Sequence, residues 1–345
     1  VNQAAFRNNG EVRVSAGTIA VSNSALSSSG SGFTTGAGAF RVLYGATVDQ
    51  PTVVNGAWRW QGGSVAGEGS LRVASGGSLV LERHNSCSMF LDTSLVNDGT
   101  LVFDGQALLC PKSGAVLTNN ATLNLVNNTA GAWISGPIDR NALVINNGLI
   151  HRVDGVDVSI VNQAAFRNNG EVRVSAGTFK LESRQGGQVT PTDSGSYTVA
   201  AGATLSLYGP RRLATGSSIA GSGKVALSDD IQVDGAGITA GELELSSLLV
   251  RFRGVTPGSG HPVFQSTGLT SFSGSVRLQA EPGWCPSNGE SLTPFRFGSY
   301  TGNPSIQVVD AEFTATQVWL SDRVRFDISD VDCDVAPPAL TSVSV

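Results

Sequence analysis

The chain has 345 residues, a formal net charge of −5, 43 glycines and only 14% charged residues. No apolar run approaches the roughly 18 residues of a membrane-spanning helix, and no stretch is rich in Lys and Arg, as a nucleic-acid-binding surface would require. We therefore expect no transmembrane segment and no nucleic-acid partner. Abundant Ser, Thr, Val, Asn and Gly favour strands and turns, and helical periodicity is missing.

Short alternating strands recur along the whole chain, with starts about 26 residues apart on average. In chain order, the predicted strands are Glu11–Val14, Phe40–Val42, Ser70–Val73, Thr100–Phe103, Thr122–Leu125, Leu149–Ile150, Glu171–Val174, Ser196–Val199, Lys224–Leu227, Glu242–Leu245 and Ser275–Leu278.

Asn-rich turns precede many of these strands, as in Asn146-Asn147-Gly148 and Asn168-Asn169-Gly170. Asn-Gly is typical of antiparallel hairpins, which would give a sandwich or a propeller. The repeat length favours a solenoid instead. A repeat of about 26 residues is long enough for one solenoid coil of two or three strands, whereas a propeller blade needs about 40–50 residues. Stacked coils would also let equivalent Asn side chains form an amide ladder. We predict an all-β, right-handed parallel β-helix, or β-solenoid.

A duplication divides the chain. Val1–Thr18 recurs without change at Val161–Thr178. Weaker matches join Gly38–Val48 to Gly195–Leu205 and Ser64–Leu71 to Ser218–Val225. We predict two solenoid repeat units, residues 1–160 and 161–260. A break rich in Pro and Gly follows, so we interpret residues 261–335 as a small C-terminal β cap and 336–345 as a linker or the start of a next module.

Three segments carry a resemblance to known repeats: Phe6–Thr18, Val199–Leu207 and Ile219–Val225. They resemble the passenger repeats of bacterial autotransporters and filamentous-haemagglutinin-like proteins. This resemblance implies right-handed β-helices that serve as stalks, adhesins or filaments. Cysteines and glycosylation sequons depart from typical bacterial passengers and favour a eukaryotic surface protein. Pro337–Val345 resembles the opening strand of an IPT/TIG module, which implies a longer, multidomain protein.

The cysteines and sequons favour an extracellular location, although each signal alone is weak. The disulfide candidates are Cys87, Cys110, Cys285 and Cys333. Cys87 and Cys110 lie about one coil apart, so they could form a disulfide between adjacent coils or remain a pair of free thiols. Cys285 and Cys333 both fall within the predicted cap. The N-glycosylation candidates are Asn120 and Asn127.

Trp58 and Trp60 are the main candidates for ligand binding. They lie two residues apart and therefore share one face of a strand. If exposed, the paired indoles would stack on sugar rings; the alternative is that they fill a corner of the solenoid.

The sequence evidence for a catalytic site is weaker than the evidence for ligand binding. His151 and Asp157 form a candidate acid–base pair, with Arg152 to hold a uronate, but strand alternation complicates this grouping because Arg152 would point away from His151, and a solvated outer face is the favoured interpretation. Asp327, Asp330, Asp332 and Asp334 could supply oxygen ligands to Ca²⁺, although a solvated acidic linker is favoured. We expect no catalytic residue, no cofactor and no bound metal.

These patterns predict a structural protein rather than an enzyme: a rod-like subunit of a cell-surface filament or stalk. Self-assembly or binding to other surface proteins is the expected partnership, and carbohydrate is a further candidate ligand. Two alternatives remain open at this point. One is an adhesin that binds glycans or another cell, and the other is a polysaccharide lyase or hydrolase built on a β-helix.

Overall fold

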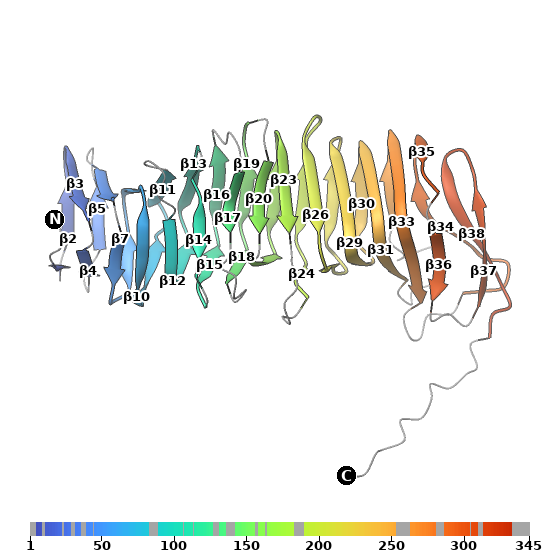
Figure 1. Ribbon diagram of the computed structural model, residues 1–345, viewed down its shortest axis with the longest axis horizontal. Coiled ribbons are helices and arrows are strands. Elements are labelled where there is room, and N and C mark those ends of the chain that lie inside the picture. The colour runs from blue at the N-terminus through green and yellow to red at the C-terminus, as the bar shows by residue number, and fades with distance from the viewer. Residues whose placement is uncertain are drawn as a thin grey trace, which may run out of the picture.

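The computed structural model is a rod built from stacked β-strands, with the N-terminus at one end and the C-terminal hairpin at the other (Figure 1). The structure describes residues 5–8, 11–22, 24–28, 32–35, 39–43, 45–82, 89–105, 107–112, 114–126, 131–135, 142–155, 158–162, 164–182, 190–252, 263–280, 286–303, 305–309 and 313–332. These residues form a 23-stranded and a 15-stranded sheet and no helix. The predicted all-β parallel solenoid is confirmed.

Each coil presents three faces, because parallel pairing joins the strands in three columns. The first face consists of β1 (Phe6–Asn8), β4 (Ser24–Ser28), β7 (Gly45–Val48), β14 (Leu109–Pro111), β17 (Gly131–Ser135), β20 (Val158–Asn162), β23 (Thr178–Glu182), β26 (Thr204–Tyr208) and β35 (Ser299–Thr301). The second consists of β2 (Glu11–Val14), β5 (Gly32–Thr35), β8 (Thr52–Val54), β15 (Val116–Asn119), β18 (Leu143–Asn146), β21 (Ala165–Asn168), β24 (Thr192–Asp193), β27 (Arg211–Leu213) and β36 (Ser305–Val309).

Some coils pass from the first face to the second within one bent strand. These long strands are β10 (Gly63–Val73), β12 (Met89–Asn97), β29 (Lys224–Asp234), β31 (Glu242–Phe252) and β33 (Leu269–Ala280). Register shifts mark the bend, for example between Ser228 and Ile231. Together the first and second faces make up the 23-stranded sheet.

The third face belongs to the 15-stranded sheet. Its parallel strands are β3 (Thr18–Val21), β6 (Ala39–Val42), β9 (Ala57–Trp60), β11 (Ser78–Glu82), β13 (Thr100–Asp104), β16 (Thr122–Val126), β19 (Leu149–Arg152), β22 (Glu171–Val174), β25 (Ser196–Val199), β28 (Ser218–Gly221), β30 (Gly237–Ala240), β32 (Val263–Ser266) and β34 (Ser291–Arg296).

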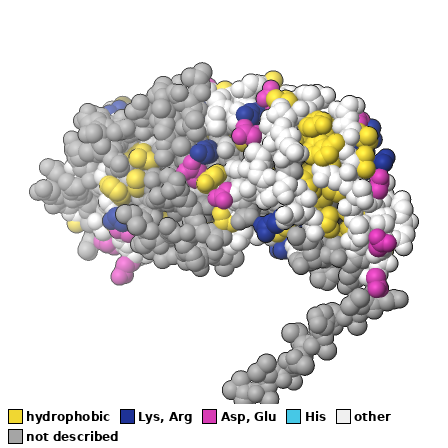
Figure 2. Space-filling view, turned by 45° about the vertical axis from the view of Figure 1, so that its right-hand side comes forward, with side chains coloured by type: hydrophobic (Ala, Val, Ile, Leu, Met, Phe, Trp, Pro, Cys, Tyr) yellow, Lys and Arg dark blue, Asp and Glu magenta, His cyan; other side chains and the backbone are white. Residues whose placement is uncertain are grey.

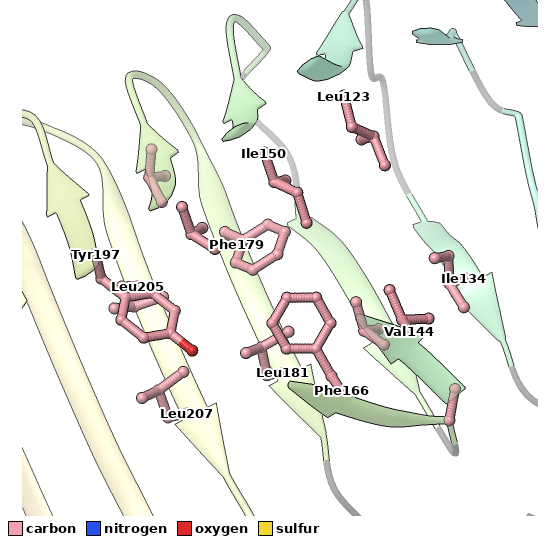
Figure 3. Packing of buried hydrophobic residues seen from close by; sticks show 14 of the residues in the cluster. Leu123, Ile134, Val144, Ile150, Phe166, Phe179, Leu181, Tyr197, Leu205 and Leu207 are labelled. Carbon is pink, nitrogen blue, oxygen red and sulfur yellow. The ribbon is translucent and has the colours of Figure 1, made fainter. Parts of the chain in front are cut away.

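One apolar core runs along the rod and receives side chains from all three faces. In the middle of the rod, Ile150 points inward from the third face, Phe166 from the second and Phe179 from the first (Figure 3). The residues between these inward positions point outward because successive strand residues alternate direction. A single coil could not bury its own apolar side, so each coil depends on its neighbours for stability.

An antiparallel hairpin closes the C-terminal end of the third face. Strand β38 (Arg323–Ser329) pairs antiparallel with β34, and β37 (Thr314–Trp319) pairs antiparallel with β38. Trp319 packs edge-on against Phe272 with ring centroids 5.6 Å apart and stacks on Tyr300 at 4.8 Å. Figure 2 shows apolar side chains gathered toward this end. Parallel coils continue through β32, β33, β35 and β36, so the cap proper is the hairpin that follows them.

The duplicated 18-residue segment occupies different faces in its two copies. In the first copy, Glu11–Val14 lies on the second face and Thr18–Val21 on the third. In the second copy, Glu171–Val174 lies on the third face and Thr178–Glu182 on the first face of the next coil. The same sequence therefore forms the same strands after rotation by one face, because each strand needs only an inward apolar row and a parallel neighbour.

Candidate functional site

Four stacked turns form the most regular polar feature of the rod: Asn97-Asp98-Gly99, Asn119-Asn120-Ala121, Asn146-Asn147-Gly148 and Asn168-Asn169-Gly170. They lie between the second and third faces, where Asn168-Asn169-Gly170 follows Asn146-Asn147-Gly148 by one coil. A Cβ atom at Gly148 would lie 2.2 Å from the Ala121 carbonyl oxygen, and one at Gly170 would lie 2.2 Å from the Gly148 oxygen. Glycine is required there because the backbones of stacked turns approach so closely.

The first Asn of each turn points into the core and belongs to an inner ladder. Nδ2 of Asn97 donates to Oδ1 of Asn119 at 2.7 Å, Asn119 donates to Asn146 at 2.8 Å, and Asn146 donates to Asn168 at 2.8 Å. Each Nδ2 also donates to a backbone carbonyl of a following coil, as Asn146 does to Glu171 at 2.9 Å. The four amides are fully buried and remain hydrogen-bonded, which offsets the cost of removing them from water.

The second residue of each turn forms an outer ladder that runs in the opposite direction. Nδ2 of Asn169 donates to Oδ1 of Asn147 at 2.9 Å, Asn147 donates to Asn120 at 2.9 Å, and Asn120 donates to Oδ1 of Asp98 at 2.8 Å. This hydrogen bond from Asn120, with the Arg72 guanidinium at 2.6 Å, holds the pKa of Asp98 below its ordinary value, although burial opposes the shift. The predicted amide ladder is therefore present twice.

A buried ionic cluster ends the inner ladder. The backbone N–H of Asn168 donates to Oδ1 of Asp193 at 2.8 Å. Oδ2 of Asp193 accepts from the hydroxyl of Tyr197 at 2.7 Å and from Nη1 of Arg211 at 2.6 Å. Arg211 also donates to the Phe166 carbonyl at 3.1 Å and lies over the ring of Phe166. The carboxylate and the guanidinium have no exposed surface.

Burial and the charges of this cluster shift its ionisation. Burial raises the pKa of the Tyr197 hydroxyl well above its ordinary value, and the Asp193 carboxylate adds to the rise. For Arg211, burial opposes the charged form, but the Asp193 carboxylate outweighs it and the pKa is raised. The cluster therefore keeps a neutral phenol beside the ion pair of Arg211 and Asp193. Such a group is suited to fixing the register of neighbouring coils rather than to proton transfer.

The glycan-stacking prediction for Trp58 and Trp60 is wrong. Both indoles are 1% exposed and belong to the core, where Trp58 packs on Phe40 with ring centroids 4.2 Å apart. Nε1 of Trp60 donates to the Gly62 carbonyl at 3.0 Å. The strand Ala57–Trp60 turns Arg59 outward instead, where it pairs with Glu82 at 2.5 Å. The inward row is the one that carries the most apolar surface.

Of the residues proposed for acid–base catalysis, the structure describes His151 and Arg152. Nε2 of His151 lies 2.8 Å from the Ser175 hydroxyl on the third face, and burial lowers the pKa of His151, with a further contribution from Arg173. Arg152 points into the core and is fully buried, so it cannot hold a uronate on the surface. Asp157 lies outside the described residues.

Among the acidic C-terminal candidates, Asp327 lies on β38, and Asp330 and Asp332 follow that strand. Asp327 accepts from Ser291 at 2.7 Å and pairs with Arg325 at 2.8 Å; these contacts lower its pKa. Within the described ranges, no group of three or more His, Cys, Asp or Glu side chains is placed to hold a metal ion. Asp334 lies outside those ranges.

The disulfide and glycosylation predictions are mostly untested. Cys110 is half-buried on β14, beside Phe90 of the preceding coil, whereas Cys87, Cys285 and Cys333 lie outside the described residues. Asn120 is exposed on the outer ladder, and Asn127 lies outside the described residues. In the described part of the chain, no helix is long and apolar enough to cross a membrane.

No family model matches the chain, and none of the curated proteins is significantly similar to it. The fold and its ladders define the chain as a β-solenoid repeat protein.

Proposed function

We propose that the chain is a rod-like structural element of a cell surface, serving as a stalk or as a filament subunit. The observation that carries this proposal is the continuity of the rod: parallel ladders on three faces and one core extend from the first coils to the C-terminal hairpin. Because every coil is held by its neighbours, bending the rod would break many hydrogen bonds at once. The two asparagine ladders add a second, side-chain set of links between the central coils.

The hairpin favours the stalk over an end-to-end filament. Strands β38 and β37 extend the third face beyond β34, while the first and second faces end at β35 and β36. A second rod docking in line would meet the hairpin before it could pair with those two edges. A covered edge is also a known protection against uncontrolled strand pairing.

We propose a non-enzymatic role outside the cell. Several described carboxylates on the rod's surface pair with basic side chains, as Asp92 does with Lys112 at 2.8 Å and Glu244 with Lys224 at 2.7 Å, and such pairs support a structural role for these charges. The exposure of Asn120 within its sequon supports glycosylation of a secreted chain. Expression in secreting eukaryotic cells tests this: Asn120→Gln should remove one glycosidase-sensitive mobility shift. Asn127→Gln serves as the comparison for the second sequon.

Negative-stain electron microscopy of the purified chain tests the rod. Single stiff rods of uniform length are the expected result and favour the stalk. Long fibres with an axial repeat of one rod would favour the filament instead. Compact or irregular particles would overturn the proposal in both forms.

A further inference from the structure

Arginines from distant parts of the sequence come together on the second face of the rod. Arg167 on β21, Arg212 on β27, Arg251 on β31 and Arg277 on β33 all point outward, since the residue that precedes each of them in its strand is buried. We call these four side chains the arginine row. They are spread over more than a hundred residues of sequence, so no local run of basic residues indicates in the sequence that they lie on one face.

Two arginines of the row are anchored by the same kind of hydrogen bond. Nε of Arg212 donates to Oδ2 of Asp234, and Nε of Arg251 donates to Oε1 of Gln279 at 2.9 Å. In both cases the acceptor lies on the next strand of the ladder. Arg72 lies on the same face further toward the N-terminus, and its Nε donates in the same way to Oδ2 of Asp98 at 2.6 Å. An arginine anchored through Nε keeps its two Nη groups for a further partner and holds them in a fixed orientation.

The exposed charged side chain of the Arg212–Asp234 pair is the arginine. Asp234, which anchors Arg212, is fully buried, whereas 37% of the Arg212 side chain is exposed. Arg251 is held by the neutral amide of Gln279. Gln232 lies between Arg212 and Leu249 in the ladder and adds an outward amide. The row therefore offers oriented guanidinium groups with amides beside them.

The spacing of the row determines the shape of its ligand. Arg212 and Arg277 share one register position across the ladder, with Gln232 and Leu249 between them. Arg251 lies two residues further along its strand, in register with Asp234 and Gln279. The strands of Arg212 and Arg251 are two ladder steps apart, which is about 10 Å, and the row from β21 to β33 spans about 24 Å along the rod. A row of this length, with Arg251 displaced to one side, suits an extended polymer with repeated anionic groups. Guanidinium binds carboxylate and sulfate in bidentate geometry, and amides bind hydroxyl groups.

We propose that the arginine row binds a linear acidic polysaccharide, with uronate or sulfate groups on Arg212 and Arg251. This inference goes beyond the structural role; it rests on the arginine row and, from the proposed function, takes only the stacking of the coils into a rod. If binding fails while rods are seen in the microscope, the structural proposal stands; if rods are not seen, both fail.

Titration calorimetry of the full chain tests the proposal with three probes: polygalacturonate, heparin and neutral dextran. We expect binding to at least one acidic polymer and none to dextran; the two acidic probes distinguish carboxylate from sulfate recognition. Arg251→Gln should weaken binding about tenfold, as loss of a charge-assisted pair predicts. Arg212→Gln/Arg251→Gln should weaken it further, with far-ultraviolet circular dichroism to verify folding because Asp234 loses its cation.

Two variants separate geometry from charge. Arg251→Lys keeps the charge but loses the anchored fork, so binding should remain weakened. Arg173→Gln removes the same charge from the third face and should leave affinity within about twofold of the unaltered chain. Equal losses for Arg251→Gln and Arg173→Gln would overturn the proposal. Equally tight binding of single-stranded DNA of matched charge would overturn it too, because it would show non-selective polyanion binding.

Discussion

Nη1 of Arg211 lies 2.6 Å from Oδ2 of Asp193, and neither side chain has any surface exposed to solvent. This ion pair lies where the inner asparagine ladder ends and an apolar row resumes, since Asp193 is followed in the ladder by Leu213. A buried pair of this kind fixes which strands are neighbours, because any slip would leave one charge without its partner.

Removing one member of this pair should destabilise the rod strongly. Asp193→Ala leaves the Arg211 charge buried, and we expect a loss of about 3–5 kcal/mol in the free energy of unfolding, measured by urea denaturation. Asp193→Leu/Arg211→Met should recover much of that loss, since no charge then remains in the core. Asp92→Asn, in the exposed pair with Lys112, is the control and should cost less than about 1 kcal/mol. A cost for Asp193→Ala no larger than the control would contradict this role.

Neighbouring asparagines in one turn should differ in their effect on stability. Asn146→Ala removes a buried amide and leaves Oδ1 of Asn168 and the Glu171 carbonyl short of a donor, so we expect a loss of about 3 kcal/mol. Asn147→Ala affects an exposed amide, and water can replace its bonds, so the loss should be about 0.5 kcal/mol. Thermal unfolding of both variants measures the contrast. Equal shifts in melting temperature would show that the inner ladder contributes no more to stability than the outer ladder.

Asp98 should contribute to the acid sensitivity of the rod. Its native pKa lies below the ordinary value of 3.8, so its contribution is complete above that value and is lost as the pH falls through the lower native pKa. The stability difference between the unaltered chain and Asp98→Asn should therefore be constant near neutral pH and shrink in strong acid. Chemical unfolding at a series of pH values measures it. A difference that grew as the pH fell would have the wrong sign for this mechanism.

Trp58 should matter for stability rather than for ligand binding. Trp58→Ala opens a cavity beside Phe40 and Trp60 in the core, and we expect a loss of about 3–5 kcal/mol in a urea titration. Arg59→Ala, on the outward side of the same strand, should cost less than about 1 kcal/mol. If Trp58→Ala unfolded no more easily than Arg59→Ala, the buried placement of the indole would be refuted.

Repetition made the fold predictable from sequence. Recurring strands at coil spacing and Asn-Asn-Gly turns were enough to predict parallel stacking and an amide ladder, because both depend on the same local pattern in every coil. The predicted strands nevertheless fall on all three faces: Thr100–Phe103 lies on the third, Ser275–Leu278 on the second and Lys224–Leu227 on the first. The spacing alone did not assign a face, since each face has the same alternation.

Side-chain direction and long-range partners were harder to predict. Two tryptophans on one side of a strand are compatible with either direction; the charged Arg59 between them was the available signal that the indoles face the core. Asp193 and Arg211 resemble surface residues in the sequence, and nothing local indicates that both are buried. The arginine row could not be predicted from the sequence for a similar reason, because its members come together only when the coils stack.

The rotated duplicate has a consequence for how such a rod changes over evolutionary time. Since Glu11–Val14 and Glu171–Val174 are identical yet face different directions, gain or loss of a single strand turns every later outward residue by a third of a circle while the apolar interior stays filled. New surface chemistry can thus arise by rotation, without a change in any codon of the displayed segment. A row of arginines on one side of an ancestral rod could become a row on another side in one genetic event.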